Sequence, residues 1–160
     1  MYTYNKRLGT HALMTPHLMV WTCRNCKDIP TNCAKIDEIV FCVPPIPDSP
    51  LSGSEILNMG VEELCIYDIY KDNKNADTWW IYLMDIYNCK DHNFSQSCAS
   101  HYKRQSKINI KALEACKSKR GVMLFDEYLM WQTVGVPYTP AVVINNRVYR
   151  VVLYVKCREA

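Results

Sequence analysis

The sequence predicts an α/β fold in which short strands near both ends of the chain flank a helical middle. The first strand is expected at His17–Trp21, a continuous apolar run. The last two are expected at Ala141–Ile144 and Arg147–Leu153, separated by Asn145-Asn146, a dipeptide that tolerates the positive φ of a tight turn. Between them, apolar residues recur with helical spacing. We expect the strands from the two ends of the chain to share one sheet.

Length and composition are those of one globular domain. The chain has 160 residues, of which 49% are hydrophobic and 22% charged, enough apolar material for a single core. We therefore expect one domain over residues 1–160. The net charge is only +3, and no basic stripe indicates nucleic acid or an anionic membrane surface. No apolar run approaches the roughly 18 residues that cross a bilayer, so no membrane span is expected in this chain.

A loop rich in cysteine and proline is expected at about residues 23–50. It contains four cysteines and five prolines, and each proline removes a backbone donor and fixes φ. Only Ile36–Cys42 has the apolar character of a short strand or a helical turn. Where this stretch is ordered, we expect disulfides to hold it together.

A helical insertion is expected at about residues 53–120. Ser54 and Glu55 open the first helical pattern, and Asn109 is a good N-cap for a later helix. The segment WWIYLMDIYN is apolar almost all round, which predicts a buried helix. The basic run Lys117–Arg120 is expected to be a solvated helix end. The later helices are expected at residues 79–88, 94–106 and 109–119, with one beyond the insertion at residues 122–134.

Cysteine is the unusual residue type of this chain. Four disulfides with one thiol left over would need an oxidising compartment. Asn93 begins an Asn-X-Ser glycosylation acceptor, which agrees with the same compartment. Only one C-x-x-C occurs, which is weak support for zinc, so we expect neither a metal site nor another cofactor. The nine candidates for structural disulfides are Cys23, Cys26, Cys33, Cys42, Cys65, Cys89, Cys98, Cys116 and Cys157.

The number of cysteines predicts a lumenal or extracellular protein. Its first residues, MYTYNKRLGTHALM, lack the apolar segment of a signal peptide. Three explanations stay open: an export signal was removed, the chain is part of a longer precursor, or the cysteines are reduced.

The order of elements around the C-x-x-C carries a resemblance. A strand is followed by Cys23-x-x-Cys26, then by helices, and then by Thr139-Pro140 before the closing strands. This order resembles the thioredoxin superfamily with a helical insertion, as in DsbA-like proteins. In that superfamily the proline after Thr is cis and lies opposite the dithiol, which makes Pro140 the cis-proline candidate. The resemblance implies an α/β, thioredoxin-like fold with a DsbA-like helical insertion, cross-linked by disulfides.

Five longer motifs occur in order from about Thr15 to the end of the chain. They are TPHLMVWTC (15–23), VEELCI (61–66), WWIYLMDIYNC (79–89), NIKALEAC (109–116) and TPAVVINNRVYR (139–150). Together they resemble the lumenal region that follows the protease-associated domain in vacuolar sorting receptors, although Ile81 and Val151 depart from the family pattern. The resemblance implies a module of the secretory and endosomal–vacuolar pathway with a protein partner or cargo peptide. It would be part of a receptor or a subunit of a larger complex.

Two functions remain open for Cys23 and Cys26. In a non-catalytic interaction module, no residue is catalytic and both cysteines are structural. We favour this function because Pro30 and the polar residues around it disfavour a long helix after Cys26, whose N-terminus would activate a thiolate. In a DsbA-like thiol–disulfide oxidoreductase, Cys23 would be the nucleophile, Cys26 the resolving thiol, and Pro140 the residue that positions the substrate chain. A bond between Cys23 and Cys26, close to Pro140 and before a helix, would strengthen the enzyme hypothesis; bonds to distant cysteines would exclude it.

Overall fold

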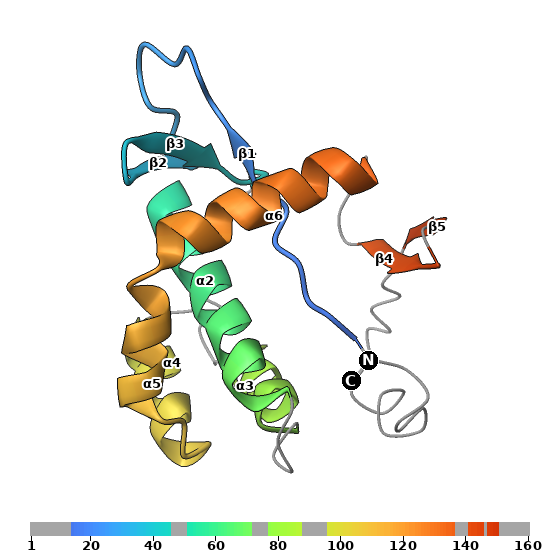
Figure 1. The fold of residues 1–160 in the computed structure, drawn as a ribbon. Coiled ribbons are helices and arrows are strands. Elements are labelled where there is room, and N and C mark those ends of the chain that lie inside the picture. The colour runs from blue at the N-terminus through green and yellow to red at the C-terminus, as the bar shows by residue number, and fades with distance from the viewer. Residues whose placement is uncertain are drawn as a thin grey trace, which may run out of the picture.

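The computed structural model describes residues 14–45, 51–71, 77–87, 96–136, 141–145 and 147–150. In these ranges a small sheet lies above a group of helices, and α6 crosses between them (Figure 1). The helices are α2 (Gly53–Tyr70), α3 (Asp77–Tyr87), α4 (Gln96–Gln105), α5 (Ile110–Lys117) and α6 (Arg120–Val134). The strands are β1 (Trp21–Thr22), β2 (Cys33–Ile36), β3 (Ile39–Cys42), β4 (Ala141–Ile144) and β5 (Arg147–Arg150).

The N-terminal sheet is antiparallel, with the strand order β1-β3-β2. β2 and β3 form a hairpin whose two turn residues, Asp37 and Glu38, both have positive φ (47° and 67°), the geometry of a type I′ turn. Cys33 and Cys42 face each other across this hairpin and are joined by a disulfide, with Cα atoms 4.0 Å apart. Of the two structures left open for Ile36–Cys42, the strand is therefore the one present.

The first predicted strand is shorter than expected. Only Trp21–Thr22 pairs in the sheet, and residues 14–20 pass α6 and α2 without regular secondary structure (Figure 1). The backbone N–H of Leu18 donates to a carboxylate oxygen of Glu127 at 2.8 Å. A side chain of α6 thus takes the hydrogen bond that a neighbouring strand would otherwise make.

The prediction that strands from both ends share one sheet is wrong for the described residues. β4 and β5 pair only with each other, in a separate antiparallel sheet. In Figure 1 this hairpin lies beyond the C-terminal end of α6, away from the sheet of β1, β3 and β2. The reason is local: β3, which lies in the segment expected to be mostly loop, supplies the neighbour of β1.

α2 is the central helix, in contact with α3, α5 and α6. Ser52 and Glu55 form its capping box, with the Glu55 N–H donating to the Ser52 hydroxyl at 3.3 Å and the Ser52 N–H donating to the Glu55 carboxylate at 2.8 Å. The core around it is formed by the least exposed side chains, which include Val20, Phe41, Val43, Leu57, Val61, Cys65, Ile66, Tyr82, Leu113 and Leu124.

The predicted helices are present to within a few residues at each end. Asn109 caps α5 as expected, because its side chain accepts from the N–H of Ala112 at 3.1 Å. The prediction that the WWIYLM helix is buried all round is wrong. Trp79 and Trp80 are buried, but Ile81 and Met84 are 43% and 48% exposed, although α3 packs against α2 and α4.

Candidate functional site

The predicted dithiol lies in the loop between β1 and β2. Cys23 and Cys26 are bonded to each other, with Cα atoms 5.7 Å apart, so the bond that the oxidoreductase hypothesis requires is present and bonds to distant cysteines are not. The N–H of Cys23 donates to the carbonyl of Val40 at 2.9 Å, which fixes this cysteine at the end of the sheet. After Cys26 the chain is exposed over residues 27–31, and the next element is strand β2.

This setting lacks the helix that activates thioredoxin-type cysteines. A helix N-terminus stabilises a thiolate by its dipole and its free N–H groups, but the described segment between Cys26 and Cys33 holds only bends and turns. Arg24 and Lys27 are the nearby cations in sequence, and both are exposed, so solvent screens their effect. The cis-proline candidate, Pro140, lies outside the described residues.

The remaining cysteine candidates fall into two groups. Cys33–Cys42 closes the hairpin, and Cys65–Cys116 joins α2 to α5 with Cα atoms 5.8 Å apart. Cys98 lies on α4, while Cys89, Cys157 and the glycosylation candidate Asn93 are outside the described residues.

The described ranges contain neither a cluster of metal-ligating side chains nor a helix suited to a membrane span. No group of three or more His, Cys, Asp or Glu side chains there is arranged to hold a metal ion. None of the helices there is long and apolar enough to cross a membrane.

A buried carboxylate at the helix junction was missed by the sequence reasoning. Glu62 on α2 is only 8% exposed. It accepts hydrogen bonds from the Tyr82 hydroxyl at 2.5 Å, from Lys103 Nζ at 3.0 Å and from Lys117 Nζ at 3.1 Å. The carboxylate thus ties α2 to α3, α4 and α5. No sequence signal reveals it, because its three partners are 20 to 55 residues away along the chain.

Electrostatics explain why Glu62 stays ionised. Burial by itself raises the pKa of a carboxyl, but the hydrogen bonds from Tyr82, Lys103 and Lys117 outweigh burial and lower the pKa of Glu62. Lys117 therefore points inward, and its side chain is 27% exposed. The prediction that Lys117–Arg120 is a solvated helix end is wrong for Lys117.

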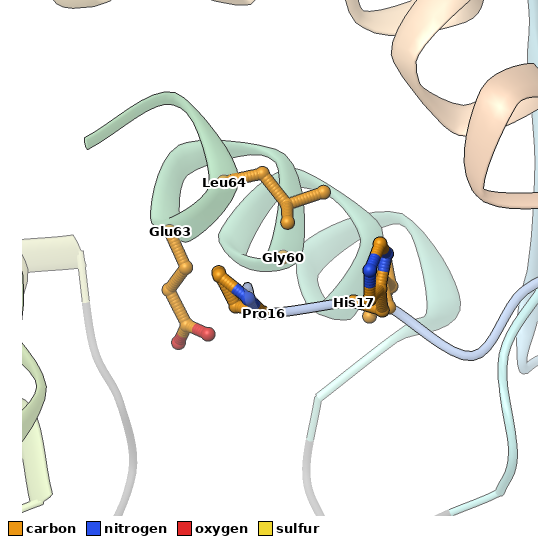
Figure 2. A pocket seen from close by; sticks show the side chains of 6 residues that line it. Pro16, His17, Gly60, Glu63 and Leu64 are labelled. Atoms are coloured by element: carbon orange, nitrogen blue, oxygen red, sulfur yellow. The ribbon is translucent and has the colours of Figure 1, made fainter. Parts of the chain in front are cut away.

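A small cavity lies where residues 16–18 cross α2. Its lining comes from Pro16, His17 and Leu18 on the crossing segment and from Gly60, Glu63 and Leu64 on the helix (Figure 2). The side chain of Leu18 packs directly against Gly60, and a Cβ added at this position would lie 2.7 Å from Leu18 Cδ2. The cavity volume is about 40 Å³, which suits water but not a metabolite.

The surroundings of this cavity raise the pKa values of two of its lining groups. Burial, followed by the nearby charge of Glu62, raises the pKa of Glu63 to about 7. The hydrogen bond between His17 Nδ1 and Glu127, at 3.2 Å, raises the pKa of His17 despite partial burial. The cavity is therefore lined by a carboxyl and an imidazole whose pKa values are both raised.

The outer face of α6 carries exposed apolar side chains. Val122, Phe125 and Leu129 are spaced three and four residues apart, so they lie on one face of the helix. All three are exposed. Exposed apolar clusters are more typical of protein-contact surfaces than of catalytic sites.

Comparison with known proteins identifies the family. A family model described as the vacuolar sorting receptor thioredoxin-like domain matches residues 3–156. Vacuolar-sorting receptor 1 of Pisum sativum is 23% identical over 159 residues, which cover 89% of this chain and 26% of that protein. Vacuolar-sorting receptor 3 of Arabidopsis thaliana is 26% identical over 159 residues, covering 89% of this chain and 25% of the relative. The chain thus spans about a quarter of the length of these curated relatives. No solved structure matches.

The family match agrees with the elements and cross-links of the fold. It extends from the segment before β1 to beyond β5 and includes all three disulfides of the described residues. The predicted fold class and the predicted family are both confirmed. The chain belongs to the vacuolar sorting receptor thioredoxin-like domain family.

Proposed function

We propose that this chain is a non-catalytic protein-interaction module of the secretory or endosomal pathway. It acts as part of a cargo-sorting receptor or as a subunit of a larger assembly. The observation that carries this proposal is the setting of Cys23–Cys26: a surface loop that leads into a strand rather than into a helix.

The geometry gives a thiolate at Cys23 little stabilisation. No helix dipole is directed at it, and Arg24 and Lys27 are exposed to solvent. A disulfide in such a place restricts the loop, and the N–H of Cys23 is already used in a bond to Val40. These features support a structural role over the DsbA-like oxidoreductase in which Cys23, Cys26 and Pro140 would do the chemistry.

The relatives support the pathway and the type of partner. They are named as vacuolar-sorting receptors, so a cargo protein or another receptor segment is the kind of molecule we expect this module to contact. The exposed apolar face of α6, formed by Val122, Phe125 and Leu129, agrees with a protein partner. Three disulfides agree with an oxidising lumen.

Insulin reduction tests the non-catalytic half of the proposal. The chain and its Cys23→Ser variant are assayed beside thioredoxin, with dithiothreitol as the electron donor. We expect both to match the dithiothreitol background, because neither has an activated thiolate. Clear activity of the unmodified chain that Cys23→Ser abolishes would establish the oxidoreductase instead.

The thiol state of the native protein tests the compartment. Rapid alkylation of cell extracts followed by mass spectrometry counts the free thiols before any can reoxidise. We expect Cys65, which is buried, and Cys116, which is half-buried, to be unmodified unless the sample is first reduced. Full labelling of both without a reductant, under mild denaturation, would place the native protein in a reducing compartment and contradict the proposed pathway.

A further inference from the structure

Positive charge is concentrated in one part of the chain. Seven of the nineteen Lys and Arg residues lie between Lys103 and Arg120, with only one of the sixteen acidic residues, Glu114. These positions lie on α4, α5 and the start of α6 or in the short connections between these helices. The rest of the chain has twelve basic and fifteen acidic residues. The net charge of +3 is therefore the sum of a basic region around α4 and α5 and a slightly acidic remainder.

Part of this charge is used within the fold. Lys103 and Lys117 both reach the buried carboxylate of Glu62, at 3.0 and 3.1 Å. Lys117 also pairs with Glu114 at 3.3 Å, so the single acidic residue of this region is already engaged. Arg120 donates to the side-chain oxygen of Asn58 at 3.3 Å. The fold explains why these basic residues are present.

Three basic residues at the α4–α5 turn have no such role. Arg104, Lys107 and Lys111 are exposed, and within the described residues none of them makes an ion pair. They are close along the backbone: the N–H of Lys107 donates to the carbonyl of Arg104 at 3.2 Å, and Lys111 lies in the first turn of α5. Ile110, beside Lys111, is 46% exposed.

Two other exposed lysines, Lys35 and Lys71, each pair with a nearby acid. Lys35 pairs with Glu38 at 2.7 Å, and Lys71 pairs with Asp68 at 2.6 Å, each partner being three residues away. The turn between α4 and α5 places no acid at such a spacing from Arg104, Lys107 or Lys111 except Glu114, which Lys117 contacts. Like charges that approach each other without counter-charges repel, and no paired acid within the described residues offsets the repulsion among these three cations.

We propose that Arg104, Lys107 and Lys111, with Ile110 among them, form a surface that binds an acidic polypeptide segment. Carboxylates of the partner would pair with the three cations, and an apolar side chain of the partner would cover Ile110. This deepens the proposed function by specifying the chemistry of the partner, and it rests on that function for the choice of a polypeptide. A lumenal protein does not meet the anionic leaflet that attracts basic surfaces in the cytoplasm.

Fluorescence anisotropy with a defined probe tests this surface. The probe is a labelled synthetic peptide rich in Glu with interspersed Leu, and its control has every Glu replaced by Gln. We expect the whole chain to bind the acidic peptide in low salt, with affinity falling as salt is added. The triple variant Arg104→Gln, Lys107→Gln, Lys111→Gln should bind about tenfold or more weakly.

A charge-matched variant separates a specific surface from net charge. Arg24→Gln, Lys27→Gln, Arg147→Gln removes the same charge from exposed positions on other elements, and it should change the affinity by less than about twofold. Equal losses in the two triples, or equal binding of the Gln peptide, would overturn the proposal. Binding to anionic phosphatidylserine vesicles without binding to the peptide would assign the surface to lipid instead. Insulin reduction reports only on Cys23, so failure here and failure of the proposed function are distinguishable.

Discussion

Two disulfides of this molecule occupy opposite physical settings. Cys23–Cys26 closes a link of 3 residues in a surface loop, between strands and beside exposed side chains. Cys65–Cys116 closes a link of 51 residues between α2 and α5, where Cys65 is fully buried and where Glu62 ties the surrounding helices together.

The difference shows that a cysteine motif in the sequence does not indicate how strongly the disulfide stabilises the fold. A cross-link restricts the unfolded chain more when the loop it closes is longer, so the helix junction gains far more from its disulfide than the surface loop does. The pair with the sequence of a redox motif is the one with least effect on the fold. The pair without any motif holds the centre of the helical layer together.

The largest expected effect comes from removing the disulfide at the helix junction. Cys65→Ala with Cys116→Ala should lower the free energy of unfolding by about 4 kcal/mol, from the loop of 51 residues that it closes. Urea denaturation followed by far-UV circular dichroism measures this loss.

The matched control removes the surface disulfide. Cys23→Ala with Cys26→Ala should cost about 2 kcal/mol or less, because the loop is short. Equal losses in the two double variants would mean that the two settings do not differ as described.

Glu62→Gln tests the carboxylate beside that disulfide. Neutralising it leaves Lys103 and Lys117 facing a group that cannot balance their charge, so we expect a loss of about 2 to 3 kcal/mol at pH 7 by urea denaturation. Because the pKa of Glu62 is lowered in the fold, its contribution is present above the unfolded value of 4.5 and disappears as pH falls through the folded pKa. In the Glu62→Gln variant this contribution is already absent, so its free energy of unfolding should not show the corresponding decrease at acid pH.

Glu114→Gln is the control for the same junction. Glu114 also contacts Lys117, but its side chain is 62% exposed, and exposed ion pairs contribute about 0 to 1 kcal/mol. A loss as large as that of Glu62→Gln would show that burial is not what distinguishes the two carboxylates.

Glu63→Gln should have the opposite effect on pH dependence. The pKa of Glu63 is raised to about 7 in the fold, so the folded state holds a proton that the unfolded state releases from about pH 4.5 upward. Stability of the unmodified chain therefore falls as pH rises from 4.5 to 7 and then levels off. The variant should remove this fall and be more stable by on the order of 1 to 2 kcal/mol at pH 8.

Thermal unfolding across pH 4.5 to 8 measures the Glu63 effect. His17 titrates in the same sense, since its raised pKa makes its contribution largest below 6.5, so His17→Gln is included to separate the two groups. A variant Glu63→Gln with the same pH profile as the unmodified chain would contradict the raised pKa.

The smallest expected effect lies in the sheet. Glu38→Gly should stabilise the chain by about 0.5 to 1 kcal/mol, because Glu38 has φ of 67° in the turn between β2 and β3 and glycine adopts this conformation without a Cβ penalty. The lost pair with Lys35 offsets little, since Glu38 is 89% exposed. Thermal unfolding measures the gain, and Glu38→Ala, which keeps the Cβ, should not show it.

The sequence predicted local structure better than the contacts between elements. The helices after residue 53 and the cap at Asn109 follow from periodicity and capping chemistry, which act over a few residues. The β2–β3 hairpin was only partly foreseen, because its turn residues Asp37-Glu38 are not the Asn-Gly or Asp-Gly that signal a type I′ turn.

The candidate site was predictable as residues but not as geometry. The C-x-x-C motif and its polar, proline-containing surroundings were visible, and they correctly disfavoured a helix after Cys26. Glu62 was not visible, because a buried charge is defined by partners that the fold brings together from distant positions. The uneven charge of α4 and α5 became informative only once Lys103 and Lys117 were seen to point inward.

The contact between Leu18 and Glu127 has a mechanical consequence. A tensile force applied to the chain before Met14 would first load the bond from the Leu18 N–H to Glu127, the side chain of Leu18 seated on Gly60, and the contact of His17. The partners in these contacts, Glu127 and Gly60, lie on α6 and α2, the two longest helices described. The force would therefore be borne by the helices before it reached β1, and the loop that contains Cys23 and Cys26 would carry little of it.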